Sequence, residues 1–143
     1  MRIWRSFLLT NGRVLRQLNE GLKGSSDLSL DDYEVLVHLS EHQDRRLRMT
    51  ELSDRLVNSQ SRLSQRVDRL VARGYVIREK CPDDRRGTFA VLTEAGFDAL
   101  EAAAPAHLAD VRRLIIDLVE PDERLVVAEV LERIASAARD SAD

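Results

Sequence analysis

Apolar residues recur at helical spacing between residues 59 and 74. Leu63, Val67, Leu70 and Val71 fall on one side of a helix over this segment. Because each residue turns a helix by about 100°, the opposite side and its edges carry hydroxyls, amides and guanidiniums. Such groups can contact base edges and phosphates in the major groove of DNA. The predicted DNA-binding residues of this helix are Ser59, Gln60, Ser61, Arg62, Gln65, Arg66 and Arg69.

A shorter helix is predicted just before this one, so that the two form a helix-turn-helix. Thr50 is its expected N-cap, and Leu52 and Leu56 are its expected buried residues. The turn between the helices is polar, and either Asn58 or Ser59 is expected to cap the second helix.

Two short β-prone runs follow Gly74, which is expected to end the helix in a left-handed conformation. The runs cover residues 75–80 and 88–92, and residues 47–49 are a candidate third strand beside them. A helix, a turn, a second helix and a hairpin, in this order, predict a winged helix-turn-helix.

The tip of the predicted wing is rich in turn-forming residues and carries two adjacent arginines. Arg85 is expected near a minor groove or a phosphate, since a narrow minor groove attracts an inserted arginine. Arg86 is the second predicted DNA contact of the wing. Asp84 is expected to pair with an arginine of the wing, above all Arg86, and together with Gly87 to structure the tip rather than touch DNA.

Ser29 is the expected N-cap of a further helix from Asp31 to about Glu41. Within and just after it, His38 and His42 lie four residues apart, a spacing that could present two imidazoles to a metal ion. No Cys, Asp or Glu is placed convincingly with them in the sequence. We therefore expect ordinary surface histidines, and neither a metal site nor a cofactor.

Long amphipathic helices are expected at both ends of the chain. One covers residues 3–22, a second runs from Thr93 to about Val119 with a kink at Pro105, and a third opens at Pro121. Their apolar stripes hold Trp4, Phe7, Leu8, Leu15, Leu18 and Leu22, then Phe97, Leu100, Leu108, Val111, Leu114, Ile115 and Leu118, then Val127, Leu131 and Ile134. The predicted winged helix-turn-helix is too small to bury these apolar stripes as well, so we expect a two-fold homodimer to bury them. A monomeric helical bundle fused to the head is the alternative.

The net charge of −3 becomes compatible with DNA binding once it is divided along the chain. Residues 45–86 hold 12 Lys and Arg against 6 Asp and Glu, whereas the rest holds 10 against 19. This asymmetry favours oriented docking on a polyanion. No apolar run approaches the roughly 18 residues of a membrane span, and the N-terminus does not resemble a signal peptide. With a single cysteine, the composition indicates a cytoplasmic protein without membrane partners.

Two stretches together resemble the MarR family of dimeric winged-helix transcriptional regulators. They are Ser61-Arg62-Leu63-Ser64…Val67-Asp68-Arg69-Leu70…Arg73-Gly74-Tyr75-Val76 and Asp83-Asp84-Arg85-Arg86-Gly87…Leu92-Thr93-Glu94-Ala95-Gly96. Asp84-x-Arg86 fits the family's wing motif, whereas Gln65-Arg66 departs from the common arginine followed by an apolar residue. The departure puts the base preference in doubt.

The resemblance implies a mainly α fold with a small β-hairpin (α+β). It implies one protomer over residues 1–143, a winged helix-turn-helix over 30–93, and dimerisation helices over 1–24 and 94–139. It also implies a homodimeric repressor that binds a palindromic operator in double-stranded DNA and is released by a small ligand or an oxidant. A ligand cleft between the head and the dimer helices is implied as well, without residues that the sequence can name.

Three other functions are weighed against this one. A winged-helix protein-interaction module without DNA binding would not need arginines on both helix and wing. A redox-sensing regulator would use Cys81, which lies near Arg78, Lys80 and Arg85 in the sequence, an environment that favours a thiolate. An enzyme is not expected, because no catalytic motif surrounds the only thiol or any serine.

Overall fold

The computed structural model describes residues 1–56, 59–82 and 84–140, of which residues 85, 86, 139 and 140 are described by their backbone alone. The chain divides into two compact units, Met1–His107 and Leu108–Asp143. Each unit is described by itself.

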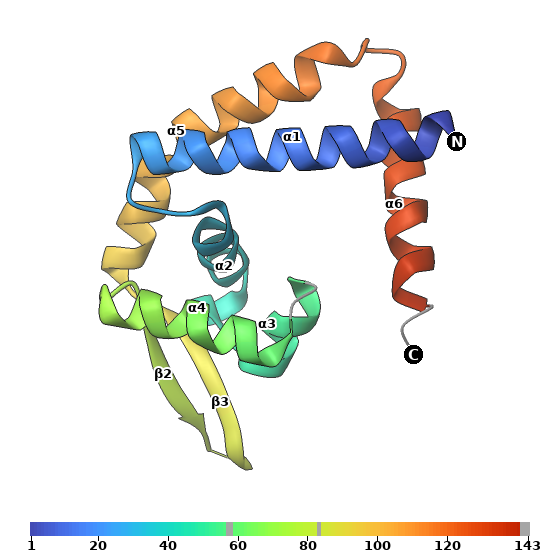
Figure 1. The fold of residues 1–143 in the computed structure, drawn as a ribbon. Helices are drawn as coiled ribbons and strands as arrows, with labels where there is room; N and C mark the ends of the chain where they lie inside the picture. The colour runs from blue at the N-terminus through green and yellow to red at the C-terminus, as the bar shows by residue number, and fades with distance from the viewer. Residues whose placement is uncertain (57–58, 83, 141–143) are drawn as a thin grey trace. The chain divides into compact units, whose positions relative to one another are not determined.

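The first unit holds most of the elements, drawn from blue to yellow in Figure 1. In chain order they are α1 (Arg2–Ser25), α2 (Leu30–Ser40), η1 (Gln43–Arg45), β1 (Arg46–Arg48), α3 (Met49–Arg55), α4 (Gln60–Ala72), β2 (Val76–Cys81) and β3 (Asp84–Leu92). Helix α5 (Glu94–Leu114) begins in this unit and contains Pro105, as expected. The second unit holds the end of α5, η2 (Ile116–Leu118) and α6 (Arg124–Asp140). The predicted mainly α fold with a small wing is confirmed.

The three strands form one antiparallel sheet in the order β1-β3-β2. Leu47 of β1 lies opposite Ala90, and Ile77 of β2 lies opposite Val91. The candidate third strand is therefore confirmed, although it covers Arg46–Arg48 rather than residues 47–49, because Met49 already belongs to α3. Strand β3 starts earlier than the predicted run at residues 88–92, because the hairpin continues outward past an irregularity between Lys80 and Cys81.

A core of leucine and valine side chains joins α2, α3, α4 and the sheet. Its fully buried members include Val35, Leu36, Leu39, Leu47, Leu52, Leu63, Val67, Leu70 and Val76. The predicted stripe of α4 is confirmed except at Val71, which is 38% exposed. Val71 lies at the edge of the stripe, about 80° of helix rotation from Leu63.

Two of the predicted helix caps are confirmed, at Ser29 and Ser59, and Asn58, the alternative cap of α4, lies outside the described residues. The Ser29 hydroxyl accepts a hydrogen bond from the backbone N–H of Asp32, and the Ser59 hydroxyl accepts one from that of Arg62. The prediction for Thr50 is wrong. Strand β1 passes directly into α3, so the helix starts at Met49 with Arg48 as N-cap, and no side chain caps it.

The last helix also begins later than predicted. Pro121 lies in a separate turn ahead of α6, where the N–H of Glu123 bonds the carbonyl of Glu120. The helix itself starts at Arg124. Its apolar residues Val127 and Leu131 are 38% and 50% exposed, so the chain alone does not bury this stripe.

The junction between β3 and α5 rests on a glycine. The Thr93 hydroxyl donates to the carbonyl of Gly74 at 2.7 Å and accepts from the N–H of Gly96 at 3.0 Å. A Cβ at Gly96 would collide with the backbone carbonyl of Tyr75 and would lie 2.8 Å from Cδ1 of Leu92. The helix can therefore approach the start of the wing this closely only without a side chain at position 96.

Gly96→Ala is expected to lower the free energy of unfolding by about 1–3 kcal/mol, because backbone must shift to admit the methyl group. Gly24→Ala is the matched control, since an added Cβ there meets no heavy atom within 4 Å. Urea denaturation of both variants measures the difference. Equal stabilities would contradict the close approach.

Candidate nucleic-acid interface

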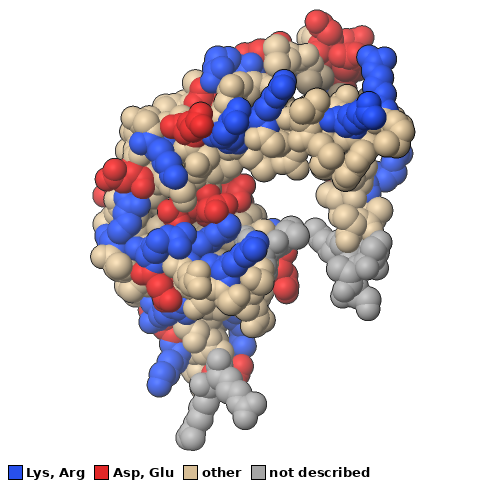
Figure 2. All heavy atoms as spheres, in the orientation of Figure 1, with Lys and Arg blue, Asp and Glu red and all other residues tan. Residues whose placement is uncertain are grey.

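The exposed face of α4 carries most of the residues predicted to bind DNA. Its N-terminal end presents Ser59, Gln60, Ser61 and Arg62, and one turn further Gln65 is exposed. These side chains point outward because Leu63, Val67 and Leu70, on the opposite side of α4, point into the core. Figure 2 shows basic and acidic side chains interleaved over the part of the molecule that carries this helix.

One flank of α4 pairs with acidic residues in the first turn of α2. Arg66 Nη2 lies 2.7 Å from Asp31 Oδ2, and the Arg66 side chain is only 14% exposed. Arg69 Nη2 lies 3.5 Å from Asp32 Oδ1. Arg66 and Arg69 were predicted as DNA contacts, but the structure brings both to carboxylates of the protein. The two carboxylates follow the Ser29 cap, so they lie in the first turn of α2, where acidic residues suit the helix dipole.

The other flank of α4 is tied to the wing. Arg78 of β2 donates through Nη2 to the Ser64 carbonyl at 3.2 Å, the Ser64 hydroxyl at 3.0 Å and Asp68 Oδ1 at 2.9 Å. Residue spacing alone could not predict this link, because its partners lie on different elements. Arg78 is therefore a residue of the interface that the pattern missed.

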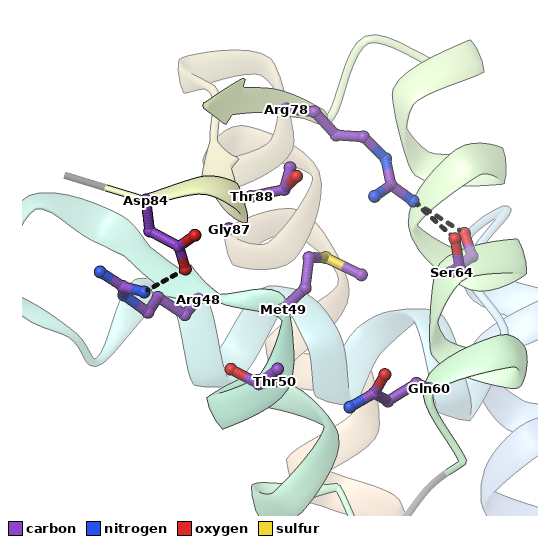
Figure 3. A pocket seen from close by; sticks show the side chains of 9 residues that line it. All are labelled: Arg48, Met49, Thr50, Gln60, Ser64, Arg78, Asp84, Gly87 and Thr88. Atoms are coloured by element: carbon purple, nitrogen blue, oxygen red, sulfur yellow. Dashed lines mark hydrogen bonds and ion pairs between the residues drawn. The ribbon is translucent and has the colours of Figure 1, made fainter. Parts of the chain in front are cut away.

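A groove lies between the wing and the N-terminal half of α4 (Figure 3). Its volume is about 420 Å³, and its lining consists of Arg48, Met49, Thr50, Gln60, Ser64, Arg78, Asp84, Gly87 and Thr88. Arg48 Nη1 lies 3.5 Å from Asp84 Oδ2, with both side chains about half exposed. Arg48 is a second residue that sequence reasoning missed. The expected partner, Arg86, has a side chain outside the described part of the chain.

Gly87 lies near the tip of the wing, where Cys81 pairs with Asp84. A Cβ there would come within 2.8 Å of the Cys81 sulfur and 3.0 Å of Asp84 Oδ2. The lack of a side chain thus allows β3 to pass close to Cys81, and the structuring role expected of Gly87 stays a prediction. Cys81 itself is 4% exposed, so its sulfur is largely shielded from solvent.

Comparison with known proteins identifies the family. The sequence model of the MarR family matches residues 26–87. The chain is 40% identical to AbsC, a MarR family transcriptional regulator from Streptomyces coelicolor, with a TM-score of 0.91 over 96% of this chain and 93% of that one. The chain belongs to the MarR family.

Two further relatives extend this similarity. Sco3205, a MarR family transcriptional regulator from Streptomyces coelicolor solved in complex with DNA, is 36% identical, with a TM-score of 0.91 over 94% of this chain and 85% of that one. The HTH-type transcriptional regulator MhqR of Bacillus subtilis is 28% identical over 130 residues, which cover 89% of this chain and 88% of that protein. Both support the assignment as a MarR-family transcriptional regulator.

A second cavity of this MarR-family chain lies within the first unit, between α1, α2 and the end of α3. It has a volume of about 450 Å³ and is lined by Leu15, Leu18, Leu30, Tyr33, Glu34, Val37, His38, Arg55, Leu56 and His107. Burial raises the pKa of the Glu34 carboxyl; the nearby Asp31 charge raises it further, and His38 and Arg66 act against both. The rings of Tyr33 and His107 are in contact, with 4.4 Å between their centroids and a tilt of 48° between their planes. Over the described residues no three His, Cys, Asp or Glu side chains are grouped to hold a metal ion.

Arg66→Ala is expected to lower the free energy of unfolding by an amount on the order of 1 kcal/mol, because it leaves Asp31 without its closest cation. Arg62→Ala is the control, since that side chain is exposed on the same helix. Thermal unfolding followed by circular dichroism measures both. If the two variants melt alike, the pair with Asp31 does not stabilise the fold.

Proposed function

We propose that this chain is a homodimeric, sequence-specific DNA-binding repressor. The observation that carries the proposal is the exposed polar face of α4, seated on a buried apolar stripe and flanked by a wing. Sco3205, a relative of 36% identity, is solved in complex with DNA, which supports DNA binding by this chain. Residues 30–93 are the proposed DNA-binding region.

Base reading is assigned to the exposed side chains near the N-terminal end of α4. Gln65 lies at the centre of the polar face, and its amide can form two hydrogen bonds with adenine. Arg62 can address guanine or a phosphate, while Ser59, Gln60 and Ser61 lie at the helix start, where backbone N–H groups suit a phosphate.

Arg66 and Arg69 have a different proposed role from these exposed residues. Because they face Asp31 and Asp32, they hold the helix against α2, and only Arg69 remains exposed enough to reach DNA as well. The side chain of Arg69 is 56% exposed, against 14% for that of Arg66.

The wing is proposed to contact the neighbouring minor groove or its phosphates through Arg85 and Arg86. The backbone of both residues belongs to β3, which extends away from the core next to β2. This role rests on the sequence and on the wing's backbone. Asp84, which pairs with Arg48, is proposed to structure the wing.

Dimerisation is assigned to residues 1–24 and 94–139. Large apolar side chains on the described part of these segments are exposed, among them Trp4, Phe7, Leu8, Leu15, Leu108, Leu118, Leu125, Leu131 and Ile134. Soluble monomers rarely expose so many large apolar residues on neighbouring turns. A second copy of the chain would cover them, and two reading heads related by a two-fold axis would match a palindromic operator.

Release by a small ligand is proposed for the cavity between α1, α2 and α3. Its volume falls within the range of about 300–1,000 Å³ that small-molecule sites occupy. The lining combines apolar side chains with a carboxyl, a guanidinium, two imidazoles and a phenol.

The alternatives are less well supported. A protein-interaction module would not need the polar face and the groove together. A redox switch at Cys81 would need an accessible sulfur, and this one is shielded. Membership of a family of transcription regulators favours binding over catalysis, so no enzymatic activity is proposed. No helix among the described residues is long and apolar enough to cross a membrane.

Gln65→Ala is expected to weaken binding to the operator by roughly 1–3 kcal/mol and binding to random duplex much less, because a base contact discriminates between sequences. The operator is selected from random duplexes with the unmodified protein, and both affinities are titrated at one salt concentration. Gln43→Ala, which lies outside α4, is the control. An equal loss of affinity for both duplexes would mean that Gln65 contacts the DNA backbone rather than a base.

Leu131→Glu is expected to convert a dimer into a monomer of about 16.2 kDa at micromolar concentration, because the charge falls on the exposed apolar stripe of α6. Glu129→Lys changes charge off this stripe and should leave the dimer intact. Sedimentation equilibrium distinguishes the states. A monomeric unmodified protein at these concentrations would refute the assembly.

A further inference from the structure

Arg78 connects the wing with α4, the two elements that are proposed to enter different DNA grooves. It lies on β2, the first strand of the wing, and its guanidinium meets α4 at Ser64 and Asp68. These two residues are four apart, so they lie on successive turns of one helix face. Figure 3 shows the guanidinium turned toward Ser64 from across the groove.

The contact is more than a solvated ion pair. Three acceptors converge on one nitrogen at 2.9 to 3.2 Å, and one of them is a backbone carbonyl of the helix. The Arg78 side chain is 30% exposed, which places it between a buried and a surface group. Hydrogen bonds from a charged donor are stronger than neutral ones, and each also fixes a direction.

The partner carboxylate lies in an unfavourable place for a DNA-binding helix. Asp68 follows Gln65 by three residues and Ser61 by seven, so it shares their side of α4, and its side chain is 64% exposed. An unpaired negative charge there would repel the phosphates that approach this face. Arg78 supplies the compensating positive charge at 2.9 Å.

Both flanks of α4 are thus held by charged contacts to other elements. Arg66 and Arg69 hold it to α2, and Arg78 holds it to the wing. If helix and wing enter adjacent grooves together, their separation must match that of the grooves. A spacing fixed before binding lowers the ordering cost of the complex.

Building on the proposed function, we propose that Arg78 is a positioning residue for operator recognition. It fixes the distance between the wing and α4 and neutralises Asp68, and it does so through the protein rather than by contacting a base or a phosphate. The three bonds from Nη2 carry this role. Operator preference therefore depends on the link itself, beyond the charge that Arg78 adds to the surface.

The test uses two substitutions that break the link from opposite sides and change the charge in opposite directions. Arg78→Ala removes a positive charge, and Asp68→Ala removes a negative one. Affinities for the selected operator and for random duplex are measured for each variant across a range of salt concentrations. Arg46→Ala is the control, because Arg46 pairs with Glu79 within the sheet at 3.9 Å and lies outside the set of residues that line the groove.

Arg78→Ala is expected to reduce the ratio of operator to random affinity about tenfold, the effect of one lost charge-assisted hydrogen bond. Asp68→Ala should reduce the same ratio, by a smaller factor because the Ser64 bonds remain, while its affinity for random duplex rises. The salt dependence of Arg78→Ala should keep the slope of the unmodified protein. Faster hydrogen exchange of β2 and β3 amides in Arg78→Ala should report the loosened wing.

Three results would overturn the proposal. If Arg78→Ala weakens both duplexes equally and lowers the log–log salt slope by about one, Arg78 is a phosphate contact. If the ratio rises or stays constant in Asp68→Ala, charge alone explains the pair. If Arg78→Ala keeps the affinity for both duplexes, the contact of Arg78 with α4 has no effect on DNA recognition. An unmodified protein that selects no operator would instead refute the proposed function, so the two failures are distinguishable.

Discussion

The complete burial of Leu63, Val67 and Leu70 is the constraint on which the interface depends. All three side chains have no exposed surface, so rotation of α4 about its axis would expose apolar area or force charged groups into the core. The rotation of the helix is thereby fixed, and with it the set of side chains that face outward. Ser61, Arg62 and Gln65 are exposed because the apolar side of α4 is packed into the core, rather than because of any contact of their own.

Ion pairs then determine the direction of the arginine side chains, after burial of the apolar stripe has fixed the rotation of α4. The segment of residues 45–86 carries a large excess of basic residues, yet much of it is matched within the fold. Arg66, Arg69 and Arg73 face Asp31, Asp32 and Asp27, which precede the segment in the chain, and Arg45 faces Glu94, which follows it. Part of the acidic excess elsewhere in the sequence is therefore the counterpart of the basic head. Apart from the largely buried Arg66, these arginines are partly exposed and their pairs contribute little stability each, so their main effect is on where the guanidiniums point.

Local sequence signals predicted the fold well wherever one segment determines its own structure. The apolar stripe of α4, the caps at Ser29 and Ser59 and the end of the helix at Gly74, whose φ is +74°, all depend on neighbouring residues. The prediction for Thr50 failed because an N-cap residue has an extended backbone, and the helix that follows β1 already starts at Met49, so Thr50 lies inside it.

The arrangement of arginines could not be predicted in the same way. The pair of Arg66 with Asp31 joins residues 35 positions apart. Such a pair becomes visible only when α2 is packed against α4. The contacts of Arg78 with Ser64 and of Arg48 with Asp84 could not be predicted either, because they too join separate elements. Spacing along one helix locates its outer face, but it cannot say which outward side chains meet a neighbouring element.

The cavity beside α2 shows how the proposed release by a ligand would be connected to the DNA-binding face. Its wall includes Leu15 and Leu18 of α1 together with Arg55 and Leu56 at the end of α3. A ligand that fills it therefore contacts a proposed dimerisation helix and the first helix of the helix-turn-helix at once. Such a ligand changes DNA affinity only by the difference between its affinities for the DNA-competent and incompetent arrangements of these helices. Reciprocity then requires bound operator to weaken the ligand by the same factor. The connection needs no path through the buried stripe of α4, because α3 borders the cavity and is the helix that precedes α4 in the chain.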